Sequence, residues 1–271
     1  MRLLIDHRTR YRFSSPQARV IQMLRMTPSD HDAQTVTNWR IDLGCDARLK
    51  SGRDGYGNRI GMLYVDGPVE VIDIAVHGEV LTEDRDGIVT GAPEPLPVEL
   101  FKRMTALTRP GDRLPDFARD VAVGREVRDR LDQLNRAIHD GIKRTHGQPD
   151  VTRSAASVFE EGRGIARDLA HIFIAAARSL DIPARFISGH WLAKTSDQTA
   201  CTAHGWAEAH VEGLGWIGFD PCTGLCPDER YVRVAAGLDA GYATPVSGAR
   251  SGGGEEELDV DVRVEVARPE D

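Results

Sequence analysis

A histidine and an aspartate in the last third of the chain have the types and spacing of a catalytic pair. His204 lies in the alternating segment 203–212, and Asp220 ends the apolar segment 216–220. The Gly-Leu-Gly sequence at 213–215 predicts a tight turn between them, and therefore an antiparallel hairpin. The hairpin would place the two side chains together, so that the carboxylate fixes the imidazole tautomer and stabilises the imidazolium. Outside a site, the same residues would be a packed strand histidine and a strand-end aspartate.

A second stretch with chemical potential is a glycine turn that leads into a helix. Gly162 and Gly164 allow a sharp turn, apolar residues then recur at helical spacing, and Ile182-Pro183 ends the helix. Ala166 therefore lies at or near the helix N-terminus. There, free N–H groups can hold an oxyanion and the helix dipole lowers the pKa of a thiol. The position would activate a nucleophile, but its residue is alanine.

Three motifs in this order resemble those of bacterial transglutaminase-like proteins, within the transglutaminase-like and papain-like cysteine protease superfamily. Residues 162–171 are Gly-Arg-Gly-Ile-Ala-Arg-Asp-Leu-Ala-His, where the family has Gly-x-Gly-hydrophobic-Cys-(Gln/Arg)-Asp-(Phe/Leu/Tyr)-Ala-His. Residues 203–209 resemble its His-Trp-Glu segment, and residues 215–221 resemble its Gly-Trp-Asp-Pro segment. The resemblance covers nearly the whole chain. It implies an α+β fold, in which a papain-like core, a helix packed on an antiparallel sheet, follows an N-terminal antiparallel β domain.

Carried over residue by residue, the resemblance places Ala166 at the catalytic cysteine, His204 at the base and Asp220 at the orienting carboxylate. In an active relative, the thiolate would attack an amide carbonyl, and water or an amine would resolve the thioester. The sequence departs from the family at a second point. Residues 142–145 are Ile-Lys-Arg-Thr and lack the aromatic residue that the resemblance places in the oxyanion site.

Two explanations of Ala166 stay open: an engineered replacement in an active cysteine hydrolase or acyl transferase, or a natural loss. The second departure favours natural loss, because one engineered substitution would leave the other position intact. The sequence thus predicts an inactive or impaired member that binds a peptide or amide ligand, or a protein partner, in the residual cleft. Whether it is an enzyme stays open, and a third alternative is a site in which His204 activates water.

The cysteines suggest neither a disulfide framework nor a metal site. They are sparse and irregular, which fits a reducing compartment. Cys201 and Cys222 lie near the histidine and the aspartate in sequence, but neither lies at a helix N-terminus, so we expect neither to replace the missing nucleophile. Cys222 and Cys226 with His204 or His210 form only a weak zinc pattern, since no second cysteine pair is present. We expect no metal and no cofactor.

Several residues beside the motifs have simpler roles. Asp168 is expected to cap the helix through the first turn, and His171 is expected to face the core. Trp206 should pack beside the catalytic histidine. Glu208 and His210 share its face of the strand and are expected at the surface or in support of the site.

Segment patterns predict three regions. Residues 1–82 form an N-terminal β domain of about six short strands, interrupted by turn residues such as Ser-Ser-Pro. Residues 83–145 form a Pro-rich connector that packs on the surface, followed by helices. Residues 146–267 form the transglutaminase-like core. Within them, residues 258–266 alternate and have acidic outward positions, which predicts an edge strand.

Composition is that of a globular protein: 271 residues, 41% hydrophobic, with a net charge of −8. The acidic balance argues against nucleic acid as a partner. No apolar run is long enough for a membrane span, and the first residues lack the apolar core of a signal peptide. We therefore expect a cytoplasmic protein with no membrane partner; the oligomeric state stays open.

Overall fold

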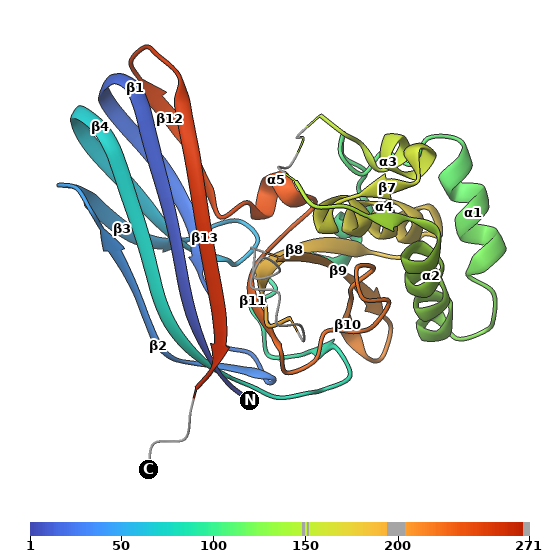
Figure 1. The fold of residues 1–271 in the computed structure, drawn as a ribbon. Helices are drawn as coiled ribbons and strands as arrows, with labels where there is room; N and C mark the ends of the chain where they lie inside the picture. The colour runs from blue at the N-terminus through green and yellow to red at the C-terminus, as the bar shows by residue number, and fades with distance from the viewer. Residues whose placement is uncertain (148–149, 151, 194–203, 268–271) are drawn as a thin grey trace.

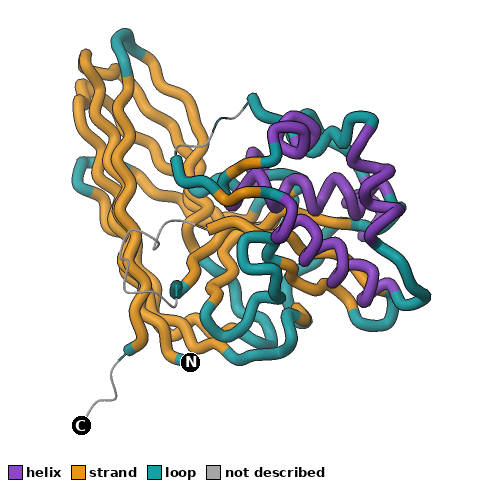
Figure 2. The backbone as a smooth tube through the Cα atoms, turned by 45° about the vertical axis from the view of Figure 1, so that its right-hand side comes forward, coloured by secondary structure: helices purple, strands orange, loops and turns teal. Residues whose placement is uncertain are grey.

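The structure is a computed structural model and describes residues 1–147, 150, 152–193 and 204–267. A β-sheet lobe lies beside a core in which helices cover a second sheet (Figure 1). The main helices gather on the side of the core away from the first sheet (Figure 2). The predicted α+β class is confirmed. Within the described ranges, no helix has the length and apolar character needed to cross a membrane.

The N-terminal sheet has the strand order β12-β1-β4-β2, with β13 also paired to β1 and β3 also paired to β4. Burial alternates along β1, as it does when one face of a sheet is packed and the other is open. The strands are β1 (Arg2–Thr27), β2 (Gln34–Leu43), β3 (Arg48–Arg53), β4 (Arg59–Thr82), β12 (Val246–Ser251) and β13 (Glu256–Val266).

The prediction of about six short strands in residues 1–82 is wrong. The structure has four strands there, and β1 and β4 contain 26 and 24 residues. The Ser-Ser-Pro segment does not end β1. Instead, the register between β1 and β4 shifts between Arg12 and Gln17, and the irregularity accommodates Pro16, which has no backbone N–H to donate.

The end of the chain also differs from the predicted organisation, which assigned residues 146–267 to the core. β12 and β13 both pair with β1 and so belong to the N-terminal sheet. The predicted acidic edge strand is confirmed, because β13 pairs with β1 alone and sets Glu257 and Asp259 opposite Arg12 and Arg10. Pairing between residues so distant in sequence cannot be inferred from local patterns.

The core sheet has the order β11-β8-β9-β10-β5. Its strands are β5 (Ile88–Val89), β8 (Ala184–Trp191), β9 (His204–Val211), β10 (Gly215–Phe219) and β11 (Tyr231–Gly237). The helices are η1 (Val98–Lys102), α1 (Arg113–Val121), α2 (Val127–Gly141), α3 (Ala155–Glu161), α4 (Ala166–Ser179) and α5 (Ala240–Ala243). The short strands β6 (Lys143–Arg144) and β7 (Arg163–Gly164) pair in parallel just before α4.

Helix α4 is the centre of the core. Every residue from Asp168 to Arg178 is buried, and α4 packs on β8 and β9 with α1, α2 and α3 around it. The connector packs on the core as expected: β5 extends the sheet beside β10, and Phe101 of η1 lies edge to face with Trp216. The sheet and α4 together fix where the motif residues meet.

Two side-chain amides join the lobes at the outer edge of β11. Gln34 donates to the carbonyl of Arg233 at 2.9 Å and accepts from its N–H at 2.8 Å. Asn58 makes the same two bonds with Ala236, both at 2.8 Å. The amides thus replace a missing neighbouring strand. Apolar residues of both lobes pack nearby: Leu3, Ile5, Val80, Val232, Val234, Val262 and Val264.

Replacing Asn58 with Leu should lower the free energy of unfolding by about 1–3 kcal/mol, because a buried N–H and a buried carbonyl of Ala236 lose their partners. Urea unfolding would measure the loss. Asn38→Leu, at an exposed position of β2, is the matched control and should change stability by about 0.5 kcal/mol or less. Equal effects of the two substitutions would show that the amide bonds do not hold the lobes together.

Candidate active site

Ala166 is the first residue of α4 and Ile165 is its N-cap, as the glycine turn predicted. Gly162 adopts a left-handed conformation, with a φ of 67°, at the end of α3 and redirects the chain toward β7. The Asp168 carboxylate accepts the Ile165 N–H at 3.2 Å, so its capping role is confirmed. The position that suits a thiolate therefore exists, but it carries a half-buried methyl group.

The predicted His–Asp pair is present at the open end of the β9–β10 hairpin. His204 Nε2 lies 2.9 Å from Asp220 Oδ2. The Tyr231 hydroxyl donates to the same oxygen at 2.8 Å, and the Cys222 N–H donates to Oδ1 at 2.9 Å. Because a carboxylate only accepts, neutral His204 carries its proton on Nε2, and Nδ1 is the basic nitrogen.

The environment keeps Asp220 ionised. Complete burial by itself raises the pKa of this carboxyl, but the charge of His204 and the hydrogen bonds from His204, Tyr231 and Cys222 outweigh it. The pKa of Asp220 is therefore below its ordinary value. The His204 ring is therefore hydrogen-bonded to an ionised carboxylate.

Aromatic rings surround His204. Trp206 lies parallel to it with a centroid distance of 6.1 Å, which confirms the predicted packing. Trp191 and Tyr231 lie 5.1 and 6.0 Å from the same ring. Sequence reasoning missed both as site residues, because only the pairing of β8 with β9 and β11 brings them to His204.

The described thiols are poor nucleophiles. Burial and the charge of Asp220 raise the pKa of Cys222 far above its ordinary value, and burial raises the pKa of Cys226 to about 11. This agrees with the expectation that Cys222 does not replace the missing nucleophile; Cys201 lies outside the described residues. In the described ranges, no cluster of three or more His, Cys, Asp or Glu side chains has the geometry of a metal site.

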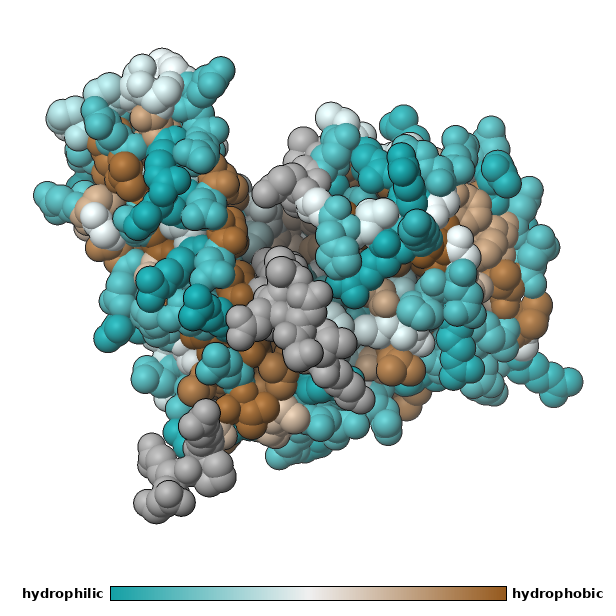
Figure 3. All heavy atoms as spheres, in the orientation of Figure 1, coloured by the Kyte–Doolittle hydropathy of each residue, from teal (hydrophilic) through white to brown (hydrophobic). Residues whose placement is uncertain are grey.

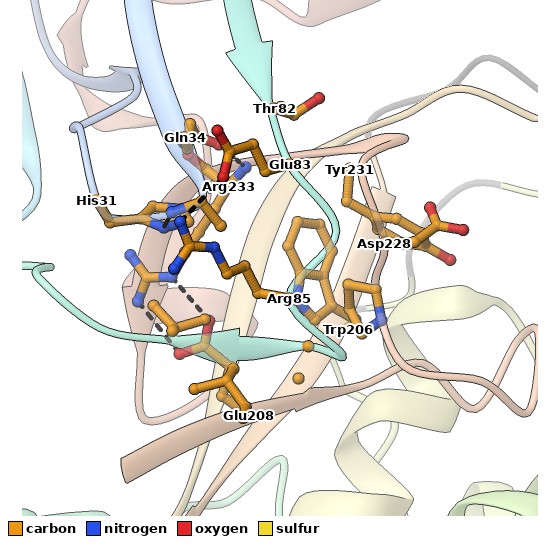
Figure 4. Close-up of a pocket in the computed structure, with 16 residues that line it drawn as sticks. His31, Gln34, Thr82, Glu83, Arg85, Trp206, Glu208, Asp228, Tyr231 and Arg233 are labelled. Atoms are coloured by element: carbon orange, nitrogen blue, oxygen red, sulfur yellow. Dashed lines mark hydrogen bonds and ion pairs between the residues drawn. The ribbon is translucent and has the colours of Figure 1, made fainter. Parts of the chain in front are cut away.

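Glu208 is completely buried, so of its two expected places the surface is excluded and a supporting position beside the site remains. Arg185 of β8 and Arg233 of β11 each approach its carboxylate to 2.7 Å. Figure 4 shows the pair of Glu208 with Arg233. Burial raises its pKa, but the two guanidinium groups outweigh this and hold the pKa at about 2. Arg185 also binds Glu94 at 2.7 Å, so the charge cluster ties the connector to the sheet behind the site.

Two further histidines from the motif segments, His171 and His210, have packing roles. His171 is buried and accepts the Ala240 N–H at 3.1 Å, and burial lowers its pKa to about 3. This confirms the expectation that it faces the core. His210 packs edge to face on Trp216 at 5.3 Å, away from His204.

A helix N-terminus packed on a sheet that carries a His–Asp pair defines the papain-like class of cores. Residues 3–81 match the family described as the bacterial transglutaminase-like N-terminal region, and residues 115–221 match the transglutaminase-like superfamily. The chain belongs to this superfamily and carries its bacterial N-terminal region.

Relatives and a solved structure match the full length of the chain. An uncharacterized protein of Mycobacterium leprae (strain TN) is 25% identical over 273 residues, covering 97% of this chain and 98% of that protein. An uncharacterized protein of Mycobacterium tuberculosis (strain H37Rv) is 24% identical over 291 residues, covering 98% and 92%. A crystal structure from Cytophaga hutchinsonii is described as a candidate cysteine protease. It aligns with 100% of this chain over 92% of its own chain, with a TM-score of 0.79 and 19% sequence identity. The two proteins therefore share a fold.

Replacing Glu208 with Gln should lower the free energy of unfolding by about 3–5 kcal/mol at neutral pH, because Arg233 loses its counter-charge and Arg185 keeps only Glu94. The pKa of Glu208 is depressed from 4.5 to about 2, so its contribution is complete above pH 4.5 and disappears as the pH falls toward 2. Unfolding measured across this pH range would show the difference shrinking. Glu212→Gln, at an exposed position, is the control, and a pH-independent difference would contradict the assignment.

Proposed function

We propose that this protein is a transglutaminase-like member without thiol-dependent turnover, which binds a peptide or amide ligand in the residual cleft. One observation carries the proposal: Ala166 occupies the first position of α4, while the His204–Asp220 pair and its Tyr231 support are complete. Loss of a nucleophile lowers turnover on the order of a millionfold in a comparable triad. Binding groups are not affected by that loss.

The surroundings of His204 support a binding role. Hydrophobic residues gather along the N-terminal sheet where it faces the core (Figure 3). Trp191, Trp206 and Tyr231 surround the histidine with buried aromatic rings, which hold its position.

The chain should bind acetylated peptide amides saturably and leave them intact. Tryptophan fluorescence would report the binding, because Trp191 and Trp206 flank His204, and mass spectrometry of the recovered peptides would report hydrolysis. Cleavage or transamidation by the chain with Ala166 would contradict the proposal. Alkylation with iodoacetamide blocks the thiol of Ala166→Cys. Cleavage that persists after this treatment, but disappears in His204→Ala, would instead support the alternative in which His204 activates water.

Introducing a thiol tests whether the activating groups persist. In Ala166→Cys, the helix N-terminus and His204 should lower the thiol pKa, so that iodoacetamide alkylates this thiol about tenfold or more faster than a free cysteine at neutral pH. The double variant with His204→Ala should lose the acceleration. Peptide hydrolysis by Ala166→Cys would favour a recent or engineered loss, whereas slow alkylation in both variants would show that the site no longer activates a nucleophile.

The three described cysteines, Cys45, Cys222 and Cys226, are free thiols. Free thiols suit a reducing compartment, and on this ground we propose the cytoplasm as the location.

A further inference from the structure

Arg144 lies next to the position that lacks its nucleophile. It ends β6, where it pairs with Gly164 of β7, two residues before Ala166. Its guanidinium carbon lies 6.0 Å from the centre of the Trp191 ring, and that ring lies 5.1 Å from the ring of His204. Arg144, Trp191 and His204 thus form a continuous cluster beside the start of α4.

The charge of Arg144 has no acidic partner in the described part of the chain, although it is only partly exposed. The nearby carboxylates are already occupied. Asp168 accepts Arg153 and Arg167, each at 3.1 Å, and Asp220 accepts His204 and Tyr231. Neither carboxylate forms an ion pair with Arg144, so they leave its charge unpaired.

A second donor in the cluster also lacks an acceptor. The indole Nε1 of Trp191 is buried and has no hydrogen-bond partner among the described residues, and Trp191 as a whole is only 9% exposed. Buried donors are usually paired. An unpaired indole N–H beside an unpaired guanidinium favours a ligand that offers several acceptor oxygens.

We propose that the residual cleft recognises a carboxylate through Arg144, so that the ligand is the acid counterpart of the amide that a cysteine-containing relative would attack. This inference rests on the proposed function: it specifies the carboxylate as the chemical group by which the peptide ligand is recognised. A carboxylate has the planar shape and size of a primary amide, so the same cleft can accept it. Guanidinium binds carboxylate through paired N–H donors and gains charge, whereas a neutral amide gains only ordinary hydrogen bonds.

The carboxylate can belong to a glutamate side chain or to a peptide C-terminus, and two isosteric pairs separate these sources. The first pair is acetyl-Ala-Glu-Ala-amide and acetyl-Ala-Gln-Ala-amide. The second is acetyl-Ala-Ala-Ala with a free carboxylate and the same peptide with a terminal amide. Calorimetric titration should show that the acid member of one pair binds roughly tenfold more tightly than its amide, with a smaller advantage at high salt.

Arg144→Tyr should abolish the preference for the acid, so that the acid and amide members of the pair bind within about twofold of each other, since the charge-assisted contact is lost. Arg125→Tyr, at an exposed position between α1 and α2, is the matched control and should keep the preference. Circular dichroism checks that both variants fold, and Arg144→Gln takes the place of Arg144→Tyr if the latter does not.

The outcomes separate the two proposals. Equal binding of acid and amide peptides would overturn the carboxylate inference and leave the proposed function standing, as would a preference that survives in Arg144→Tyr. Failure of all four peptides to bind would contradict the proposed function itself, and the carboxylate inference with it.

Discussion

The burial of Asp220 is the constraint on which the site depends. A fully buried carboxylate is stable only if it receives hydrogen bonds, and its donors come from β9, from β11 and from the turn after β10. The core sheet must therefore keep its register for the charge to be satisfied. The same bonds fix the ring of His204, so the stability of this part of the fold and the geometry of the site have one cause.

The N-terminal sheet supports that arrangement from outside the core. β11 is an edge strand and carries Tyr231 at its start, and an unpaired edge would leave its backbone groups without partners. The amides of Gln34 and Asn58 take the place of a neighbouring strand, and Glu208 with its two arginines holds β8, β9 and β11 together on the same side. The N-terminal region thus positions the candidate site, although it carries none of the motif residues.

The proposal of a binding site without thiol-dependent turnover depends on two positions at which the sequence departs from the family pattern. Ala166 stands where the resemblance implies a cysteine, beside an intact His204–Asp220 pair, and Arg144 places a positive charge where the resemblance implies an aromatic residue. An active cysteine site has to bind an amide and stabilise an oxyanion that forms only in the transition state. In the proposed carboxylate-binding site, an arginine without a neighbouring nucleophile would stabilise a permanent anion, which is the ground state of a carboxylate ligand. Retention of the His–Asp pair is compatible with this, because that pair also holds the sheet together.

The sequence by itself determined the local elements and the motif positions. Glycines and helical periodicity located the start of α4 at Ala166, and a tight turn between two apolar segments located His204 opposite Asp220, because turn and helix preferences act within a few residues. Tertiary structure alone decided that the C-terminal strands join the first sheet, that β1 continues through Pro16, that Glu208 is buried between arginines, and that Trp191 and Tyr231 meet His204. Each of these depends on pairing between segments far apart in the chain. The free energy of such contacts comes from burial and charge neutralisation in the assembled fold, which no local pattern of residues records.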